Sequence, residues 1–288
     1  MIGLLRLFHK NNGLTCGAEP RFYNYGFRAF ISCLVILCAV IMFNFVTWNV
    51  HGIKQDFKRS LLANDSARYG MDIVCLQETK CTETEDLFLH NGYRLTLIEQ
   101  KHGRHYGLGF VISPRMQKLV QSYFYISDRV AILTFQLPTK LGSNILYRVV
   151  NAYGPTMQRA TENPQLTTNF YQSLTVALTV PSRVELYIMG DFNSKLGRVT
   201  IEDSQQTRIS DHVGRHAVGT RNSNGEHMLN FLIQHDLFAA NTAFPHKCRH
   251  KTTWRGEVKD WSRPGHHTVP VYTQIDYIVC RSRSKGIL

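Results

Sequence analysis

The chain has 288 residues, of which 43% are hydrophobic and 11% aromatic, so it is long enough to bury a substantial core and is not a wholly disordered polypeptide. Its formal net charge is +12, which favours an anionic partner such as nucleic acid or a membrane surface. Seven scattered cysteines without a C-x-x-C pair argue against a disulfide framework and a zinc ribbon, and they fit a reducing compartment.

Residues 1–43 form a leader, and an apolar run extends over residues 29–46. The run is at the lower limit of length for spanning a bilayer, and the basic residues that precede it are typical of a signal anchor. The alternative is an apolar extension that leads into a core strand beginning near Phe43. An anchor predicts a membrane location, whereas the extension leaves a nuclear or cytoplasmic protein.

Residues 44–288 are predicted to form one domain, because no repeat, low-complexity tract or long linker divides them. Helical patterns cover Asp56–Tyr69, Gln165–Thr179 and Gly225–His235. Short apolar runs between turn residues predict strands over residues 43–50, 71–78, 93–99, 107–113, 129–137, 145–154, 184–193, 238–244 and 274–280. Strands outnumber helices and often follow one another directly, which favours two packed sheets with helices outside them.

Polar residues of similar chemistry lie at or just beyond the ends of several predicted strands. They are Asn49, Glu78, Tyr153, Asp191, Asn193 and Asp276. Each alone is explained by a turn, a helix cap or packing, but their recurrence after successive strands indicates a shared rim of a sheet. Carboxylate and amide oxygens suit a hard divalent cation beside a phosphate, so Mg²⁺ is the expected cofactor and Mn²⁺ the alternative, with no small-molecule cofactor.

The stretches TWNVHG, CLQETK, NAYGPT, MGDFNSKLG and QIDYIV resemble the endonuclease/exonuclease/phosphatase superfamily, which includes apurinic/apyrimidinic (AP) endonucleases and endonuclease domains of non-long-terminal-repeat retrotransposons. The further stretches GLGFVISPR, ISDRVAIL and RNSNGEHMLNFLIQHDL are similar to RTE-type retrotransposon endonucleases and a host protein related to them. The resemblance implies an α/β fold, a four-layered α/β sandwich of two packed mixed β-sheets flanked by helices. It also implies magnesium-dependent hydrolysis of phosphodiesters.

The same resemblance implies roles for the strand-end residues. Glu78 would ligate the metal and Asn49 would help to order the metal site. Asp191 would orient or deprotonate the attacking water, Asn193 would hold the phosphate or that water, and Tyr153 would contact the scissile phosphate. In-line attack on a phosphodiester needs such a base, a cation and donors, so the chemistry agrees with these roles.

The resemblance further implies a final strand with Ser-Asp-His, whose His pairs with Asp276. Residues 277–288 contain neither Asp nor His, so we expect the sheet to lack its last strand, one sheet edge to be uncovered, and activity to be impaired. The run ISDHVG contains Asp211 and His212 but precedes Asp276. These two residues are therefore predicted to belong to a long loop and not to replace the missing pair.

Residues 246–263 carry six Lys or Arg side chains interleaved with Trp254 and Trp261, a pattern that can neutralise phosphates and stack on bases. The candidate nucleic-acid ligands are Lys247, Arg249, Lys251 and Arg255. The alternative is a solvated hairpin, and Trp254 is expected to lie in the core.

Three functions follow from these observations. The first is a retrotransposon-derived DNA endonuclease, similar to AP endonucleases, monomeric and inactive if the final strand is needed. The second is a membrane-anchored phospholipid or phosphoinositide hydrolase, which rests on residues 29–46. The third is a non-catalytic nucleic-acid-binding module, which rests on the absent histidine.

Overall fold

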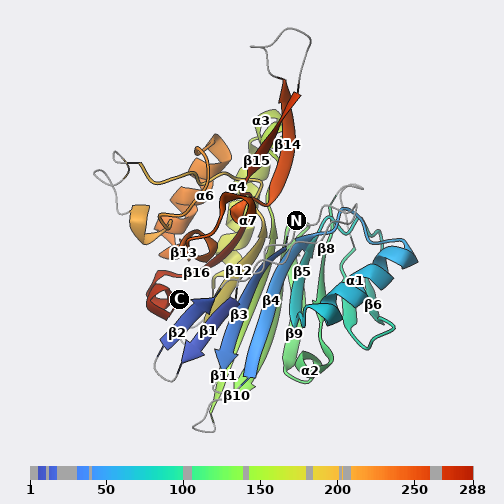
Figure 1. The fold of residues 1–288 in the computed structure, drawn as a ribbon. Coiled ribbons are helices and arrows are strands. Elements are labelled where there is room, and N and C mark those ends of the chain that lie inside the picture. Colours follow the sequence, from blue (N-terminus) through green and yellow to red (C-terminus); the bar gives the residue numbers. More distant parts are fainter. Residues whose placement is uncertain are drawn as a thin grey trace.

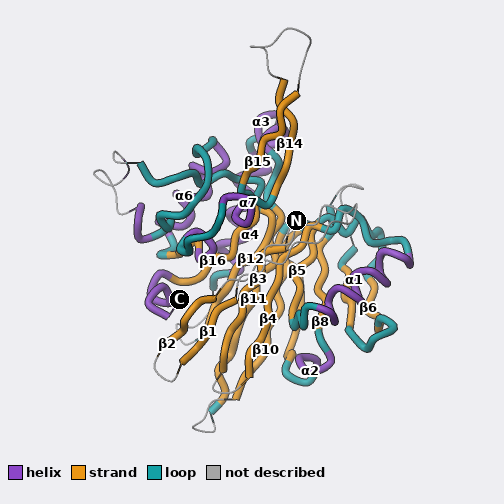
Figure 2. Tube along the Cα trace, viewed as in Figure 1, coloured by secondary structure: helices purple, strands orange, loops and turns teal. Residues whose placement is uncertain are grey.

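Two six-stranded mixed sheets pack face to face and carry helices on their outer faces (Figures 1 and 2). The computed structural model describes residues 6–10, 13–17, 31–38, 41–99, 106–138, 143–179, 184–200, 203, 209–259 and 268–287. The four-layered α/β sandwich expected from the sequence is confirmed.

The first sheet has the strand order β3-β4-β5-β8-β7-β6. In that order its strands are Ile31–Cys38, Ile41–Asn49, Ile73–Gln77, Leu108–Ile112, Arg94–Leu97 and Glu85–Phe88. Strands β4 and β5 run parallel, and the other described neighbours are antiparallel. The parallel pair brings the carboxyl ends of β4 and β5 to the same edge.

The second sheet has the order β13-β16-β12-β11-β10-β9. Its strands, in that order, are Leu237–Ala239, Asp276–Arg281, Glu185–Asp191, Asn144–Tyr153, Val130–Pro138 and Val120–Ser127. Strands β11 and β12 run parallel, whereas β16 is antiparallel to β12. The start of β16 therefore lies beside the ends of β11 and β12.

Two hairpins lie outside these sheets. Strands β1 (Arg6–Lys10) and β2 (Gly13–Gly17) form one. Strands β14 (Trp254–Lys259) and β15 (Thr268–Thr273) form the other, which extends away from the body of the molecule in Figure 1.

Helix α1 (Asp56–Arg68) covers the outer face of the first sheet, and α4 (Gln165–Ala177) and α6 (Ser223–Gln234) cover that of the second. The shorter helices are α2 (Pro114–Gln117), α3 (Met157–Glu162), α7 (Cys248–Lys251), and the 3₁₀ turns η1 (Ile209–Asp211), η2 (Ala240–Thr242) and η3 (Ser282–Ile287).

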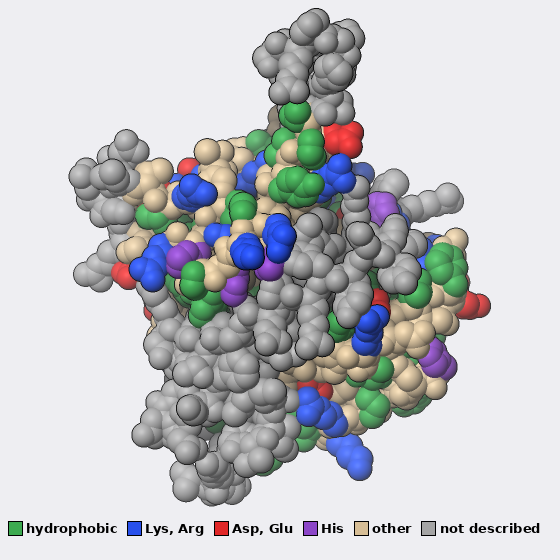
Figure 3. Space-filling model, viewed as in Figure 1, with side chains coloured by type: hydrophobic (Ala, Val, Ile, Leu, Met, Phe, Trp, Pro, Cys, Tyr) green, Lys and Arg blue, Asp and Glu red, His purple; other side chains and the backbone are tan. Residues whose placement is uncertain are grey.

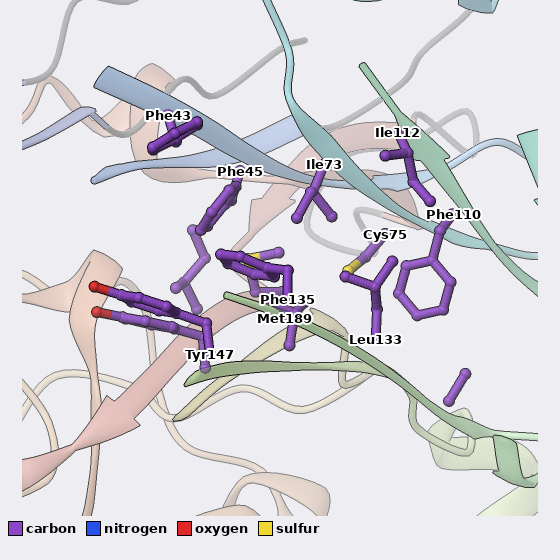
Figure 4. Close-up of a cluster of buried hydrophobic side chains, with 14 of the residues drawn as sticks. Phe43, Phe45, Ile73, Cys75, Phe110, Ile112, Leu133, Phe135, Tyr147 and Met189 are labelled. Carbon is purple, nitrogen blue, oxygen red and sulfur yellow. The ribbon is translucent and has the colours of Figure 1, made fainter. Parts of the chain in front are cut away.

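The main core lies between the sheets, where apolar side chains of both inner faces interdigitate (Figure 4). Phe135 of the second sheet meets Phe45 of the first edge-on, at 5.3 Å between ring centroids, and stacks on Tyr147 at 5.1 Å. Such rings bury large apolar areas and hold the two sheets in one register.

The apolar run 29–46 forms strand structure in its described part: β3 pairs antiparallel with β4. None of the helices in the described part of the chain has both the length and the apolar character needed to cross a bilayer. The core strand expected to start near Phe43 is found as β4, which begins two residues earlier at Ile41. The edge of β4 that faces away from β5 is paired with β3.

Candidate active site

The six strand-end residues predicted from the sequence converge at one edge of the two sheets. Asn49 ends β4, and Glu78 follows β5 directly. In the second sheet, Tyr153 pairs in register with Asp191, and Asp191 with Asp276. Asn193 lies two residues beyond Asp191, so it also belongs to this edge. Each sheet therefore supplies part of one polar site.

The Asn49 amide joins the two sheets at the centre of this site. Its Nδ2 donates to Glu78 Oε1 at 2.9 Å and to Asp191 Oδ2 at 3.0 Å. One amide thus holds two carboxylates side by side, each fixed by one of the two amide hydrogens.

Glu78 has further hydrogen-bond partners. Tyr153 OH donates to Oε1 at 2.9 Å, and His51 Nδ1 lies 2.8 Å from Oε2. Burial alone would raise the pKa of Glu78, but hydrogen bonds from Asn49, His51 and Tyr153 hold that pKa below its ordinary value. Glu78 is therefore an anion at neutral pH, as a cation ligand must be.

Asp191 and Asp276 form a buried carboxyl pair with unequal partners. Asp191 accepts from Asn49 and, at 2.9 Å, from the Asn193 backbone N–H, whereas Asp276 Oδ1 has no hydrogen-bond partner among the described residues. Burial raises the pKa of Asp191 to about 6 despite those two donors. Burial and the neighbouring Asp191 charge also raise the pKa of Asp276 well above its ordinary value. Because the two N–H donors stabilise the anion of Asp191 and none of the described groups bonds Asp276 Oδ1, the pair favours a charge on Asp191 and a proton on Asp276.

The loop after β12 is held from two sides. Asn193 Nδ2 donates to Gly154 O at 3.0 Å, and Asn224 Nδ2 donates to Asn193 O and Pro155 O, each at 3.0 Å. Asn224 was not identified from the sequence as a site residue. It belongs to the quoted stretch RNSNGEH, which offered the only sign of it.

Four non-glycine residues at this edge have left-handed backbone conformations. The φ angles are 49° for His51, 53° for Glu78, 56° for Lys80 and 49° for Asn193. Such conformations are costly for residues with a Cβ and persist where the surrounding structure imposes them, often at functional sites.

A buried amide network lies beneath the site and also joins the sheets. Gln77 Nε2 donates to Asn151 Oδ1 at 2.6 Å, and Asn151 Nδ2 donates to the carbonyls of Leu76 and Gly109, both at 2.9 Å. Asn151 was not predicted as a site residue. The only sequence signal for it is a polar residue within an apolar strand, RVVNAYG.

Arg129 is a buried cation beside Tyr153. Its Nη1 donates to Tyr153 O at 3.1 Å, and its guanidinium lies 4.3 Å from the Tyr106 ring centroid and 5.3 Å from that of Tyr153. Arg159 faces the Tyr106 ring as well, at 5.1 Å. No carboxylate among the described residues forms an ion pair with Arg129. In the sequence, Arg129 appears only as a basic residue at the start of an apolar run.

The basic segment, here residues 247–255, lies next to this site. Lys247, Arg249 and Lys251 belong to α7 or precede it, and Arg255 lies on β14 with its guanidinium 5.9 Å from the Tyr272 ring centroid. Lys and Arg side chains gather near α7 and the base of the β14–β15 hairpin in Figure 3.

Thr253 connects this basic segment to the site. Its Oγ1 accepts from the backbone N–H groups of Ile275 at 3.0 Å and Asp276 at 3.1 Å. Trp254, expected in the core, is instead 43% exposed, so that prediction is wrong. A two-stranded hairpin projecting from the body has no second layer to bury the ring, which lies across Gly256. Trp261 lies outside the described residues.

His212 is buried away from the carboxylates. Its Nδ1 lies 2.7 Å from Leu237 O, and Leu237 pairs with Arg281 at the far end of β16 from Asp276. Five strand residues correspond to about 17 Å. His212 thus has the structural role in the loop before α6 that the sequence predicted.

Comparison with known proteins agrees with the fold described above. The sequence profile of the Endonuclease/Exonuclease/phosphatase family matches residues 46–286. The chain is 28% identical over 241 residues to craniofacial development protein 2 of Tragulus javanicus, covering 82% of this chain and 37% of that protein. The chain therefore spans little more than a third of the length of the curated relatives that it matches.

Two solved structures are similar to it in fold. The catalytic domain of Xenopus laevis APE2 has a TM-score of 0.55 at 16% identity and is matched over 82% of each chain. An AP endonuclease from Archaeoglobus fulgidus has a TM-score of 0.52 at 15% identity, with 84% of this chain and 88% of that one covered.

Proposed function

Because this chain belongs to the endonuclease/exonuclease/phosphatase family, we propose that it is a divalent-metal-dependent phosphodiester hydrolase that cleaves DNA strands. The observation that carries the proposal is the Asn49 amide, which holds a charged Glu78 beside a buried Asp191 of raised pKa. One carboxylate is prepared to bind a cation and the other to accept a proton, and phosphodiester hydrolysis needs both.

The donor set fits a hard cation. Glu78 would hold it, with Asn49 Oδ1 as a second oxygen nearby. In the described part of the chain, no three His, Cys, Asp or Glu side chains converge as a metal site. That agrees with Mg²⁺ or Mn²⁺ held by one or two carboxylates, water and substrate phosphate. When bound, the ion would neutralise charge that develops on the phosphate oxygens.

The remaining residues have complementary tasks. Asp191, with a pKa near 6, is deprotonated at neutral pH yet basic enough to take a proton from an attacking water. Asn193 keeps one Nδ2 hydrogen beyond its bond to Gly154 O, and the Tyr153 O–H now donates to Glu78. Both donors would hold the phosphate in line, Tyr153 by turning its O–H from Glu78 to a phosphate oxygen.

Asp276 limits the expected rate. No histidine contacts its buried carboxyl group in the described part of the chain, and its Oδ1 is unpaired there. A histidine paired with Asp276 would donate to the phosphate in the transition state. A site without one such strong donor is typically slower by about 10²- to 10³-fold, so slow cleavage is expected. The same observation supports the second candidate function, a nucleic-acid-binding module without catalysis.

The basic segment supports DNA as the substrate. Lys247, Arg249, Lys251 and Arg255 lie along an element that Thr253 ties to the backbone of Asp276. Phosphates bound there would place a neighbouring phosphodiester at the carboxylates. Binding through this segment should weaken with salt, and Lys247→Ala should reduce the slope of log K against log salt by about 0.9.

The proposal is tested by incubating the full chain with supercoiled plasmid and Mg²⁺. Wild type should convert it to nicked circles, whereas Asp191→Asn should lower the rate by about 10²-fold or more. His212→Ala serves as the control and should nick at the wild-type rate. Salt-sensitive DNA binding with no nicking by wild type would instead favour the binding module.

A further inference from the structure

His51 lies beside Glu78 on the side facing away from Asn49. The His51 side chain is 77% exposed, and its Nδ1 lies 2.8 Å from Glu78 Oε2. Lys80 Nζ approaches the same two atoms, at 3.3 Å from His51 Nδ1 and 3.6 Å from Glu78 Oε2. An imidazole nitrogen and a carboxylate oxygen therefore both face one cationic group.

The backbone fixes this arrangement. Beyond β4 and β5 the two chains stay paired: Val50 N–H donates to Gln77 O at 3.0 Å, Gly52 N–H to Glu78 O at 2.6 Å and Ile53 N–H to Thr79 O at 3.0 Å. These bonds bracket His51 and Glu78, both of which have positive φ angles. The side-chain pair is thus held by a backbone conformation that costs free energy to maintain.

The distances suit two ligands of one metal ion. Neighbouring ligands of an octahedral ion with bonds of about 2.1 Å are about 3 Å apart. His51 Nδ1 and Glu78 Oε2 are 2.8 Å apart, which is close to that spacing, and the Lys80 ammonium lies against both. Without metal, an N–H at Nδ1 donates to Glu78; metal binding requires the other tautomer of the ring, with its proton on Nε2. A divalent ion would take the place of that ammonium and use the Nδ1 lone pair of a neutral imidazole.

We propose that His51 is a nitrogen ligand of the divalent cation that Glu78 holds, and that it gives the site a preference for Mn²⁺ over Mg²⁺. The inference rests on the proposed function and adds to its metal site. Mg²⁺ favours oxygen ligands, whereas imidazole raises affinity for ions later in the first transition row. The sequence suggested no nitrogen ligand, because His51 precedes Glu78 by a full strand and helix.

The test uses the full chain, Mn²⁺ alone as the probe, and electron spin-echo spectroscopy, which detects a directly bound ¹⁴N nucleus. Wild type should show imidazole nitrogen coupling. His51→Asn should lose the coupling and raise the Kd for Mn²⁺ by about 10-fold or more, with the Kd for Mg²⁺ changed far less. Asn tolerates the left-handed backbone, so the loop should keep its conformation.

His90→Asn is the matched control, because His90 lies elsewhere and contacts Asn64 Oδ1 at 3.0 Å. It should keep both the coupling and the Mn²⁺ affinity. Coupling that is absent from wild type, or that persists in His51→Asn, would overturn the assignment of His51 while leaving the Glu78 cation site intact. Failure of wild type to bind Mn²⁺ at all would overturn that site and the proposed function together.

Discussion

At the scale of single residues, the site depends on how partners are divided between two neighbouring carboxyl groups. Asp191 has two N–H donors, whereas Asp276 has an unpaired oxygen in the described structure. The charge therefore rests on Asp191 and the proton on Asp276. The sequence supplied both residues, but which of them is charged depends on contacts with Asn49 and Asn193 that only the fold creates.

This division predicts a pH dependence. A base with a pKa of about 6 is protonated below that value, so kcat/KM for strand cleavage should rise with pH up to about 6 and then level off. A pH series of initial nicking rates at fixed Mg²⁺ measures it. A rate that is flat from about pH 5 to pH 8 would exclude Asp191 as the base.

The same burial predicts a gain in stability when the charge is removed. The folded-state pKa of Asp191, about 6, exceeds the ordinary pKa of 3.8 that applies in the unfolded chain, so the folded chain binds more protons between these values. The free energy of unfolding therefore falls as pH rises through this range, and the full cost is present above about pH 6.

Asp191→Asn should relieve that cost and raise the free energy of unfolding by about 2 to 3 kcal/mol at neutral pH, with little change near pH 3. Urea unfolding at both pH values measures the difference. An equal change at the two pH values would mean that ionisation is not the cause.

Arg129 is inferred to position Tyr153, whose carbonyl and ring it contacts. Arg129→Met should lower kcat by about 10-fold through loss of that positioning, with KM for DNA changed much less. The decisive measurement is the double variant. In a Tyr153→Phe background, Arg129→Met should cost little more, whereas a full additional 10-fold loss would show that Arg129 acts independently of Tyr153.

Among the secondary-structure elements, apolar runs in the sequence predict most strands, and the strands that were not predicted differ physically from those that were. Strands β5 and β12 are buried on both faces and form continuous apolar runs, so they were predicted. Strands β6 and β9 are sheet edges with half-exposed side chains and mixed patterns, so they were missed.

The run at residues 238–244 shows how a side chain can end a strand. Only its first residues are extended, as the end of β13, because Asn241 Nδ2 donates to Asp276 O at 2.9 Å and the chain turns as η2. The residues that end strands in the site were all predicted. His51, Asn151 and Arg129 were not, because each acts through a partner on another strand that no local pattern reveals.

The link between the two sheets gives a prediction for Asn151. Asn151→Ala would remove three buried hydrogen bonds, one from Gln77 Nε2 and two to the carbonyls of Leu76 and Gly109, and should lower the free energy of unfolding by about 2 to 3 kcal/mol. Asn144, exposed at the start of the same strand, is the control, and Asn144→Ala should change it by less than about 0.5 kcal/mol. Equal effects in chemical denaturation would show that the network does not hold the sheets together.

At the scale of the whole molecule, the site exists because two sheets dock. Asn49 and Glu78 come from the first sheet, and Tyr153, Asp191 and Asp276 from the second. Docking is driven by the apolar core between the sheets, and the polar contacts at its edge then align the carboxylates. The formal net charge of +12 favours association with a polyanion at a rate that falls with salt.

We propose that this edge of the two sheets cleaves DNA when a divalent cation is bound. Single-turnover cleavage of an end-labelled duplex by the full chain, with and without Mg²⁺, tests this proposal. We predict slow, Mg²⁺-dependent strand cleavage that Asp191→Asn reduces by about 10²-fold or more. Cleavage that continues undiminished in Asp191→Asn, or no cleavage by wild type at a concentration that saturates the DNA, would contradict it.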